Sequence, residues 1–479
     1  MPLHIFIEVS ASIVYNYREE GESMNRLTPK IIAEVTGGKY IGNEEWKDIP
    51  VAGAVRDNRD VKDGNLFVCI RGARVDGHDF ANVAFESGAA CCLTEQEITD
   101  AKGPYVIVDS TLKAIQTLGG YYRSLFDIPV IGITGSVGKT TAKEIIASVL
   151  GEKLCVLRTE MNFNNELGVP LTLLALEEKH DVAVIEMGIS DFGHMSKLAI
   201  MVRPDIFVMT KIGYAHIEEL GDLQGVLRAK TEAFAYMKPT GIAVLNGDDE
   251  LLLGYDPKMR KIIFGLEGHN DVRAENIRSD SIEYIDLDIA SDESDFHIRI
   301  PAYGSHIAAL APAAVIVARL LGMTDDEIRR GFLLYAPVEG RSRITDAEGI
   351  VLIDDCYNAS PNSVKAALTS ISSLQGRHVA ILGDMLELGE HSDKMHNEVG
   401  AFAAQNNIDV LLCQGDKARF MYEGYLSANG AQAHYYQTMD DLVAELPEMI
   451  KKGDAILVKA SRGMSFDKLL PIISDLKVK

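Results

Sequence analysis

A short glycine-containing segment between an apolar strand and a helix most constrains the fold of this chain. Residues 130–144 read VIGITGSVGKTTAKE. The apolar part predicts a buried strand, and the part that begins near Lys139 predicts a helix. In such a phosphate-binding loop, backbone amides and the positive helix end face an anion, the lysine reaches the outer phosphates and the Thr140 hydroxyl can bind Mg²⁺. The flanking strand and helix disfavour the alternative, a chance glycine turn.

The loop departs from the pattern G-x-x-x-x-G-K-[ST] at its first position, where Ile133 stands. It keeps Gly135, Gly138, Lys139 and Thr140, and these residues alone leave kinases, GTPases and ligases open. The guanine-reading motif N-K-x-D is not found in the sequence, which disfavours a GTPase.

Length and charge narrow the class of protein. A chain of 479 residues with 47% hydrophobic content has room for about three domains. Its formal charge of -23, from 70 acidic and 47 basic side chains, repels nucleic acid and anionic membranes. The sequence has no run of 18 apolar residues, so we expect no membrane-spanning segment. We therefore expect a cytoplasmic monomer whose partners include neither nucleic acid nor membrane.

The cysteines and the first residues give two further expectations. Six cysteines are scattered with neither C-x-x-C nor Cys/His ligand spacing, which predicts reduced core residues. They are Cys69, Cys91, Cys92, Cys155, Cys356 and Cys413. Residues 1–23 have no basic segment or clear cleavage site of a signal peptide, and we expect them to be an extension outside the fold.

The pattern of strands and helices predicts three α/β domains. Residues 24–108 have short strands such as NLFVCIRG, CCLT and PYVIVD. In residues 109–337, the apolar runs PVIGIT, DVAVIEM, DIFVMT and GIAVLN alternate with helices, which predicts a doubly wound parallel sheet. Residues 338–479 repeat this alternation and predict a Rossmann-like domain without its glycine fingerprint. A ligand cleft is expected between the last two domains.

Three residues after the loop are candidates for its chemistry. Glu186 ends an apolar strand at the sheet edge where such folds bind ligands, so it is a plausible magnesium ligand. His216 follows the strand DIFVMT, and Lys230 lies on a predicted helix. Taken singly, they have alternative interpretations as a loop-edge acid, a structural histidine and a solvated lysine.

The order of motifs resembles the Mur ligase family, ATP-dependent enzymes that add amino acids to the nucleotide-linked peptidoglycan precursor. The resemblance covers residue 24 to the C-terminus and rests on TGSVGKTT, TEMNFNNELGVP, VIEMG, AHIEELG, AKTE, EGRSRI, DDCYNASPNS, ILGDMLELG and LVKASRGMSFDKL. The family loop reads T-G-[ST]-x-G-K-T-[TS], which accounts for the missing first glycine.

The resemblance implies an N-terminal UDP-substrate domain, a central ATP domain and a C-terminal ligase domain. The spelling DDCYNASPNS followed by LGDMLELG is similar to family members that join D-alanyl-D-alanine to UDP-N-acetylmuramoyl-tripeptide through an acyl phosphate. The implied cofactors are ATP and Mg²⁺.

The resemblance also assigns residue roles. The implied catalytic residues are Lys139, Glu186, His216 and Lys230, with Thr140 and Glu186 on one Mg²⁺, His216 on a second, and Lys230 similar to a lysine that is carbamylated in the family. The implied ATP-binding residues are Thr134, Gly135, Ser136, Val137, Gly138, Lys139, Thr140, Thr141, Arg341, Asp355, Tyr357 and Asn358. The implied substrate-binding residues are Asp57, Asn58, Arg59, Asn162, Asn164, Asn165, Lys459, Ser461 and Arg462.

Some positions depart from the family pattern. Ile307 and Leu310 stand where the adenine site has asparagines, and Asn58 stands where serine is usual. Each lost hydrogen bond removes about 0.5 to 1.5 kcal/mol, so we expect altered base recognition with phosphate binding kept. Two alternatives stay open: a Mur-type amide ligase for another acid and amine, and a non-catalytic nucleotide-binding paralogue.

Overall fold

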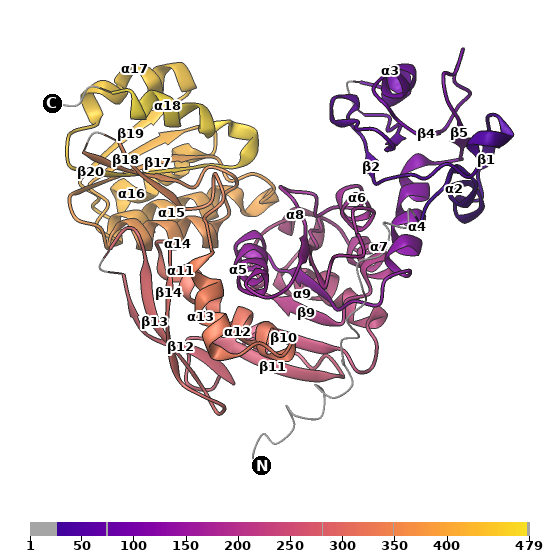
Figure 1. Cartoon of the computed structure of the whole chain (residues 1–479). Coiled ribbons are helices and arrows are strands. Elements are labelled where there is room, and N and C mark those ends of the chain that lie inside the picture. The colour runs from indigo at the N-terminus through magenta and orange to yellow at the C-terminus, as the bar shows by residue number, and fades with distance from the viewer. Residues whose placement is uncertain (1–25, 73–74, 280, 348, 477–479) are drawn as a thin grey trace.

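Three lobes, each built around one sheet, make up the protein. The computed structural model describes residues 26–72, 75–279, 281–347 and 349–476. The sheets have five, nine and six strands, and the lobes follow one another along the chain (Figure 1). The predicted extension 1–23 lies outside the described residues. The predicted three-part α/β fold is confirmed.

The first lobe is a small α/β unit. Its sheet has the order β1-β5-β4-β3-β2. Helix α2 (Pro29–Thr36) begins with Thr28, whose side chain accepts from the Ile31 amide, and ends at Gly37, which has a φ of 66°. Both features are usual helix ends. The other elements are β1 (Lys39–Ile41), β2 (Ala54–Val55), β3 (Leu66–Val68), α3 (Ala81–Glu86), β4 (Cys91–Thr94), β5 (Tyr105–Ile107) and α4 (Thr111–Arg123), which leads to the second lobe.

The second lobe has helices on both faces of its sheet. The strand order is β14-β13-β12-β11-β10-β9-β6-β8-β7. The strands are β6 (Val130–Thr134), β7 (Val156–Arg158), β8 (Val182–Glu186), β9 (Ile206–Met209), β10 (Ile242–Asn246), β11 (Arg260–Gly265), β12 (Val272–Arg278), β13 (Ile285–Ser291) and β14 (Phe296–Ile300). Ile131 of β6 packs in the core with α5 (Lys139–Gly151) and α12 (Ala311–Leu320). Its neighbour Val130 packs in the opposite core with α7 (His194–Val202). This alternation is the predicted doubly wound arrangement.

The remaining helices of this lobe are short. They are α6 (Gly168–Leu173), α8 (Ile217–Leu220), α9 (Leu223–Thr231), α10 (Glu250–Leu253), α11 (Ser305–Ala308) and α13 (Asp325–Leu333).

The antiparallel end of the nine-stranded sheet was not predicted. Strands β12, β13 and β14 pair antiparallel to one another. Along β14, buried and exposed residues alternate, because only one face of this part of the sheet is covered. A search for continuous apolar runs finds the four strands β6, β8, β9 and β10 and passes over such half-polar strands.

The third lobe is a second wound sheet, of order β15-β16-β20-β17-β18-β19. Strands β16 (Ile350–Asp354), β17 (Arg377–Gly383), β18 (Val410–Gln414) and β20 (Asp454–Lys459) match predicted strands. The edge strands β15 (Arg343–Ala347) and β19 (Gln432–Tyr436) were missed because they have no continuous buried apolar run: β15 has no buried residue and β19 has one. The helices are α14 (Pro361–Ile371), α15 (Ser392–Gln405), α16 (Ala418–Ser427), α17 (Met439–Met449) and α18 (Leu469–Ser474).

The prediction for the cysteines holds at five positions. All six are free thiols, and five are buried. The prediction is wrong for Cys155, which is exposed. It lies just before the edge strand β7, where the sheet has no further neighbour to cover it.

Candidate active site

The phosphate loop joins β6 to α5 and owes its shape to two glycines. Gly135 and Gly138 have φ values of 151° and 85°, which other residues rarely adopt. A Cβ at Gly135 would lie 2.0 Å from Oγ1 of Thr210, so a side chain cannot be placed there. Ile133, at the position of the missing glycine, is a fully buried residue of β6. The turn therefore starts two residues later than in the common pattern, and a glycine at 133 would serve no purpose.

The segment after β9 braces this loop. The Thr210 hydroxyl donates to the carbonyl of Val137 at 2.6 Å. The amide of Ser136 donates to the carbonyl of Lys211 at 2.7 Å, and the Ser136 hydroxyl donates to the carbonyl of Gly213 at 3.0 Å. Sequence reasoning missed Thr210, although a polar residue that closes an apolar strand at the ligand edge was a usable signal.

Glu186 at the end of β8 is a buried carboxylate with one free oxygen. Its Oε1 accepts from the Thr140 hydroxyl at 3.2 Å and from the Asn164 amide at 2.7 Å. Its Oε2 is buried and has no hydrogen-bond partner. A buried anionic oxygen without a partner is unfavourable unless a cation meets it, so Thr140 and Glu186 fit a Mg²⁺ ion. Among the described residues, no three His, Cys, Asp or Glu side chains form a metal cluster, so other ligands would come from nucleotide or water.

Lys139 lies near this carboxylate, and a second lysine, Lys230, lies near Lys139. The half-buried Lys139 donates from Nζ to the carbonyl of Gly135 at 2.7 Å. Burial lowers the pKa of Lys139; the negative charge of Glu186 opposes this shift, and Arg341 adds to it. Arg341, from the segment before β15, therefore lies close enough to act on the phosphate loop.

Lys230 of α9 is 1% exposed. Burial, with the nearby positive charge of Lys139, holds the pKa of Lys230 well below its usual range. Within the described parts of the chain, no carboxylate oxygen lies within 4.0 Å of its amine. An unpaired buried lysine is costly in the charged form, so burial favours the neutral form of this amine.

His216 lies between the second and third lobes. Burial and the positive charges of Lys139 and Lys230 lower the pKa of His216 to about 4, so the ring is neutral at neutral pH. Its Nδ1 lies 2.7 Å from Oε2 of Glu387 in the third lobe, but the two atoms are not aligned as a hydrogen bond. Glu387 was not predicted, because only the docking of the lobes brings it to His216.

In the third lobe, the side chains of two arginines lie against the ring of one tyrosine. The ring of Tyr357 lies 4.0 Å from the guanidinium carbon of Arg341 and 5.2 Å from that of Arg462. Arg462 also donates to the Tyr357 hydroxyl at 3.2 Å. The three residues form one cationic corner.

Lys459 is held inside the third lobe. Its Nζ donates to Oδ2 of Asp355 at 2.6 Å, to the Asp355 carbonyl at 3.3 Å and to the Asn358 carbonyl at 2.9 Å. All three N–H donors are therefore used within the protein. The Ser461 hydroxyl donates to the Ala359 carbonyl at 3.4 Å. In this structure Lys459 and Ser461 shape the segment that carries Tyr357.

The predicted substrate residues outside the third lobe fall into two groups. In the first lobe, Arg59 forms an ion pair of 2.5 Å with Asp57 and is largely exposed. The second group is the loop after β7, where Phe163 lies 5.5 Å from the guanidinium carbon of Arg56, so the first lobe touches this loop. Asn58 lies beside Arg59, and Asn162 and Asn165 lie in the loop after β7. Of the predicted ATP-binding residues, Thr134 and Thr141 lie at the ends of the phosphate loop.

The residues at the predicted adenine site are apolar. Ile307 of α11 is buried, and the side chain of Leu310 lies 3.3 Å from the position of a Cβ at Gly138. This packing gives a hydrophobic support to the phosphate loop where the family pattern places amides.

His306 of α11 connects the second and third lobes, and its burial leads us to expect that the stability of the protein depends on pH. Its Nε2 lies 3.2 Å from the Ser342 hydroxyl and its Nδ1 lies 3.5 Å from the Ser370 hydroxyl. Burial lowers the pKa of His306, and Lys459 adds to this while Asp355 opposes it. The unfolded chain therefore takes up the proton first as the pH falls below about 6.5, and the folded protein loses stability from there down to the folded pKa, by up to about 1.4 kcal/mol per pH unit.

We expect His306→Gln to flatten this loss between pH 7.5 and pH 5.5. Urea unfolding at both pH values measures it, with His434→Gln on the outer strand β19 as the control. An equal loss in wild type and His306→Gln would contradict the assignment.

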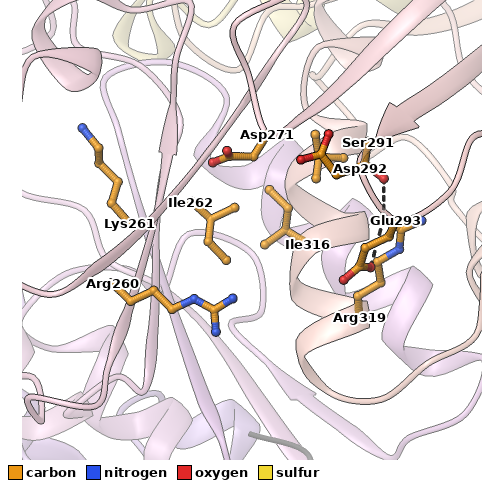
Figure 2. A pocket seen from close by; sticks show the side chains of 10 residues that line it. Arg260, Lys261, Ile262, Asp271, Ser291, Asp292, Glu293, Ile316 and Arg319 are labelled. Atoms are coloured by element: carbon orange, nitrogen blue, oxygen red, sulfur yellow. Dashed lines mark hydrogen bonds and ion pairs between the residues drawn. The ribbon is translucent and has the colours of Figure 1, made fainter. Parts of the chain in front are cut away.

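A separate hollow lies away from this site. It has a volume of about 220 Å³ and is lined by Arg260, Lys261, Ile262, Asp271, Val272, Ser291, Asp292, Glu293, Ile316 and Arg319 (Figure 2). Arg260 pairs with Ile242 at the start of β10, whereas the phosphate loop lies level with the strand ends. Arg319 is already paired with Asp325 at 3.0 Å. The hollow lies beside β11 and the start of β12, and its lining contains none of the candidate site residues.

A braced phosphate loop at the carboxyl edge of a doubly wound sheet, with a buried carboxylate and two lysines beside it, defines a P-loop nucleotide-binding protein. Known domains match the chain in order. The Mur ligase family catalytic domain matches residues 52–122, the Mur ligase middle domain 133–318, and the Mur ligase glutamate ligase domain 340–462.

Curated relatives extend this match to nearly the whole chain. The UDP-N-acetylmuramoyl-tripeptide--D-alanyl-D-alanine ligase of Bacillus subtilis is 36% identical over 459 residues, which are 95% of this chain and 99% of the relative. The protein of the same name from Synechocystis is 34% identical and covers 87% of this chain and 91% of its own. The chain belongs to the Mur ligase family.

Solved structures of this family are similar to the whole chain as well. MurF from Acinetobacter baumannii superposes with a TM-score of 0.84 at 28% identity, covering 94% of this chain and 98% of its own. MurF ligase from Thermotoga maritima in complex with ADP has a TM-score of 0.78 at 27% identity, covering 88% and 97%.

Proposed function

We propose that this protein is an ATP-dependent ligase that joins D-alanyl-D-alanine to UDP-N-acetylmuramoyl-tripeptide in peptidoglycan precursor synthesis. The single observation that carries the proposal is the Bacillus subtilis relative of that name, which is 36% identical over 95% of this chain. The geometry of the phosphate loop and of Glu186 is what such a reaction requires.

The reaction has two steps, and in each step one bond forms and one bond breaks. The terminal carboxylate of the tripeptide forms a bond to the γ-phosphorus of ATP, the bond from that phosphorus to the β–γ bridging oxygen breaks, and ADP leaves. The amine of D-alanyl-D-alanine then forms a C–N bond to the carbonyl carbon of the acyl phosphate. Phosphate leaves, and the amine gives up a proton. Catalysis of such phosphoryl transfer is chiefly positioning and charge neutralisation.

The proposed roles follow from where the residues lie. Lys139 and the amides after Gly135 hold the outer phosphates. Thr140 and Glu186 would hold one Mg²⁺ ion, and His216 with a carbamylated Lys230 would hold a second. Mg²⁺ supplies neutralisation of the negative charge on the phosphate oxygens.

The third lobe contributes the cationic corner of Arg341, Tyr357 and Arg462, which faces the nucleotide and the incoming dipeptide. We assign Asp355, Asn358, Lys459 and Ser461 to holding that corner. Asp57, Asn58 and Arg59, with the loop that contains Asn162 and Asn165, bind the sugar nucleotide. We place the enzyme in the cytoplasm, where ATP is found, and propose a monomer. In the described parts of the chain no helix is long and apolar enough to cross a membrane.

A coupled assay of ADP release tests the function. We expect release only when UDP-N-acetylmuramoyl-tripeptide and D-alanyl-D-alanine are both present, with lysine and diaminopimelate compared as the third residue. Release with other acid and amine pairs alone would indicate a different ligase of the family. Tight nucleotide binding without any release would indicate a non-catalytic paralogue.

A further inference from the structure

The side chain of Asn164 is directed at the metal-binding carboxylate. Its Nδ2 donates to Oε1 of Glu186 at 2.7 Å, and the Thr140 hydroxyl donates to the same oxygen at 3.2 Å. Both hydrogen bonds fall on Oε1, while Oε2 is buried and has no partner. The two donors therefore fix which oxygen of Glu186 is left for a cation.

The backbone of Glu186 is fixed as well. Its amide donates to the Thr159 hydroxyl at 2.9 Å. The Thr159 carbonyl accepts from Nζ of Lys143 at 2.7 Å, and both residues are almost fully buried. With its main chain anchored, the remaining freedom of Glu186 is rotation of the carboxylate, which Asn164 and Thr140 restrict.

A glycine allows the loop of Asn164 to come this close. The amide of Gly188 donates to the Asn164 carbonyl at 2.8 Å. A Cβ at Gly188 would lie 2.9 Å from Cγ of Asn164 and would push the side chain away. Gly188 follows β8 by two residues, so the chain that presents Glu186 also seats Asn164.

We propose that Asn164 is a positioning residue for the metal site, which turns Glu186 so that Oε2 faces the metal-bound nucleotide. This role differs from the substrate contact predicted for it and for its loop neighbours Asn162 and Asn165. It also places the substrate loop and a metal ligand in one hydrogen-bonded unit. The kinetic part of the inference rests on the proposed ligase function; the metal-binding part does not.

Removing this amide is expected to weaken metal binding selectively. Loss of a group that orients a metal ligand typically lowers metal affinity by about 10- to 100-fold. We expect Asn164→Ala to lower the affinity of the enzyme–ADP complex for Mn²⁺, measured by electron paramagnetic resonance, by that factor. Binding of metal-free ADP, measured by calorimetry, should stay within about twofold of wild type, because the hydrogen bonds of Asn164 among the described residues go to Glu186 and Gly188 and not to the phosphate loop.

Asn162→Ala is the matched control, since it removes an amide from the same loop that has no bond to Glu186. It should leave Mn²⁺ affinity unchanged and raise KM for the sugar nucleotide. For Asn164→Ala, kcat at low Mg²⁺ should fall and be largely restored at high Mg²⁺, with KM for the sugar nucleotide little changed.

Unchanged Mn²⁺ affinity in Asn164→Ala would overturn the proposal, and a raised KM for the sugar nucleotide beside it would assign Asn164 to direct substrate contact. A wild-type protein that binds Mn²⁺ and ADP but does not convert ATP to ADP with the two substrates would reject the proposed function alone. The comparison of Mn²⁺ affinities would still test the role of Asn164.

Discussion

Lys139→Ala is expected to lower the rate of ADP release by about 10³-fold or more. Phosphoryl transfer depends on cations that meet charge developing on the transferred group, and loss of one preorganised group of this kind costs about 3 to 4 kcal/mol or more. Lys139 is the cation of the phosphate loop, and Arg341 and Glu186 lie close enough to act on its pKa. Initial rates with saturating substrates measure the effect.

The fold should tolerate this change. The printed hydrogen bond of the Lys139 amine is to the carbonyl of Gly135, within the loop itself. We therefore expect a free energy of unfolding within about 1 kcal/mol of wild type. Lys238→Ala, an exposed lysine of the same lobe, is the control and should keep full activity. Near-normal turnover of a folded Lys139→Ala would reject the role assigned to this lysine.

The parallel part of each sheet could be predicted from the sequence because its physical signal is local. A strand covered on both faces must be apolar throughout, as in Val182–Glu186, where all five residues are buried. Strands such as Phe296–Ile300 are covered on one face only and alternate with polar residues, so their pattern resembles that of a loop. They are recognised only once the neighbouring strand is known.

The residues of the candidate site also divide into those that the sequence predicts and those that only the folded arrangement brings together. The loop residues and Glu186 are fixed by position in one strand–turn–helix unit or at one strand end, so their spacing predicts them. Thr159 and Thr210 act through contacts between neighbouring strands and loops, which depend on register. Glu387 reaches His216 only through the docking of two lobes. No spacing within the sequence encodes such a contact.

We expect the buried Lys230 to be carbamylated. Lys230→Ala is therefore expected to lower the rate of ADP release by about 10² to 10³-fold. A neutral amine reacts with CO₂: the nitrogen forms a bond to carbon, a proton is released, and an anionic carbamate remains. Burial and the charge of Lys139 hold the pKa of Lys230 well below its usual range, which favours the reactive neutral form of the amine. The carbamate would turn an unpaired buried amine into an anion beside the neutral His216, able to hold a cation.

Carbon-13 NMR of protein incubated with labelled bicarbonate measures the modification. We expect one carbamate signal in wild type that is absent from Lys230→Ala, while Lys143→Ala, which removes the other buried lysine of this lobe, should keep it. Because a lower folded pKa preserves the neutral amine, the signal should persist at pH values where exposed lysines are fully protonated. Thermal unfolding separates this chemical effect from loss of structure. A folded Lys230→Ala with wild-type rates, or a signal equal in both proteins, would mean that the lysine is buried without acting in the reaction.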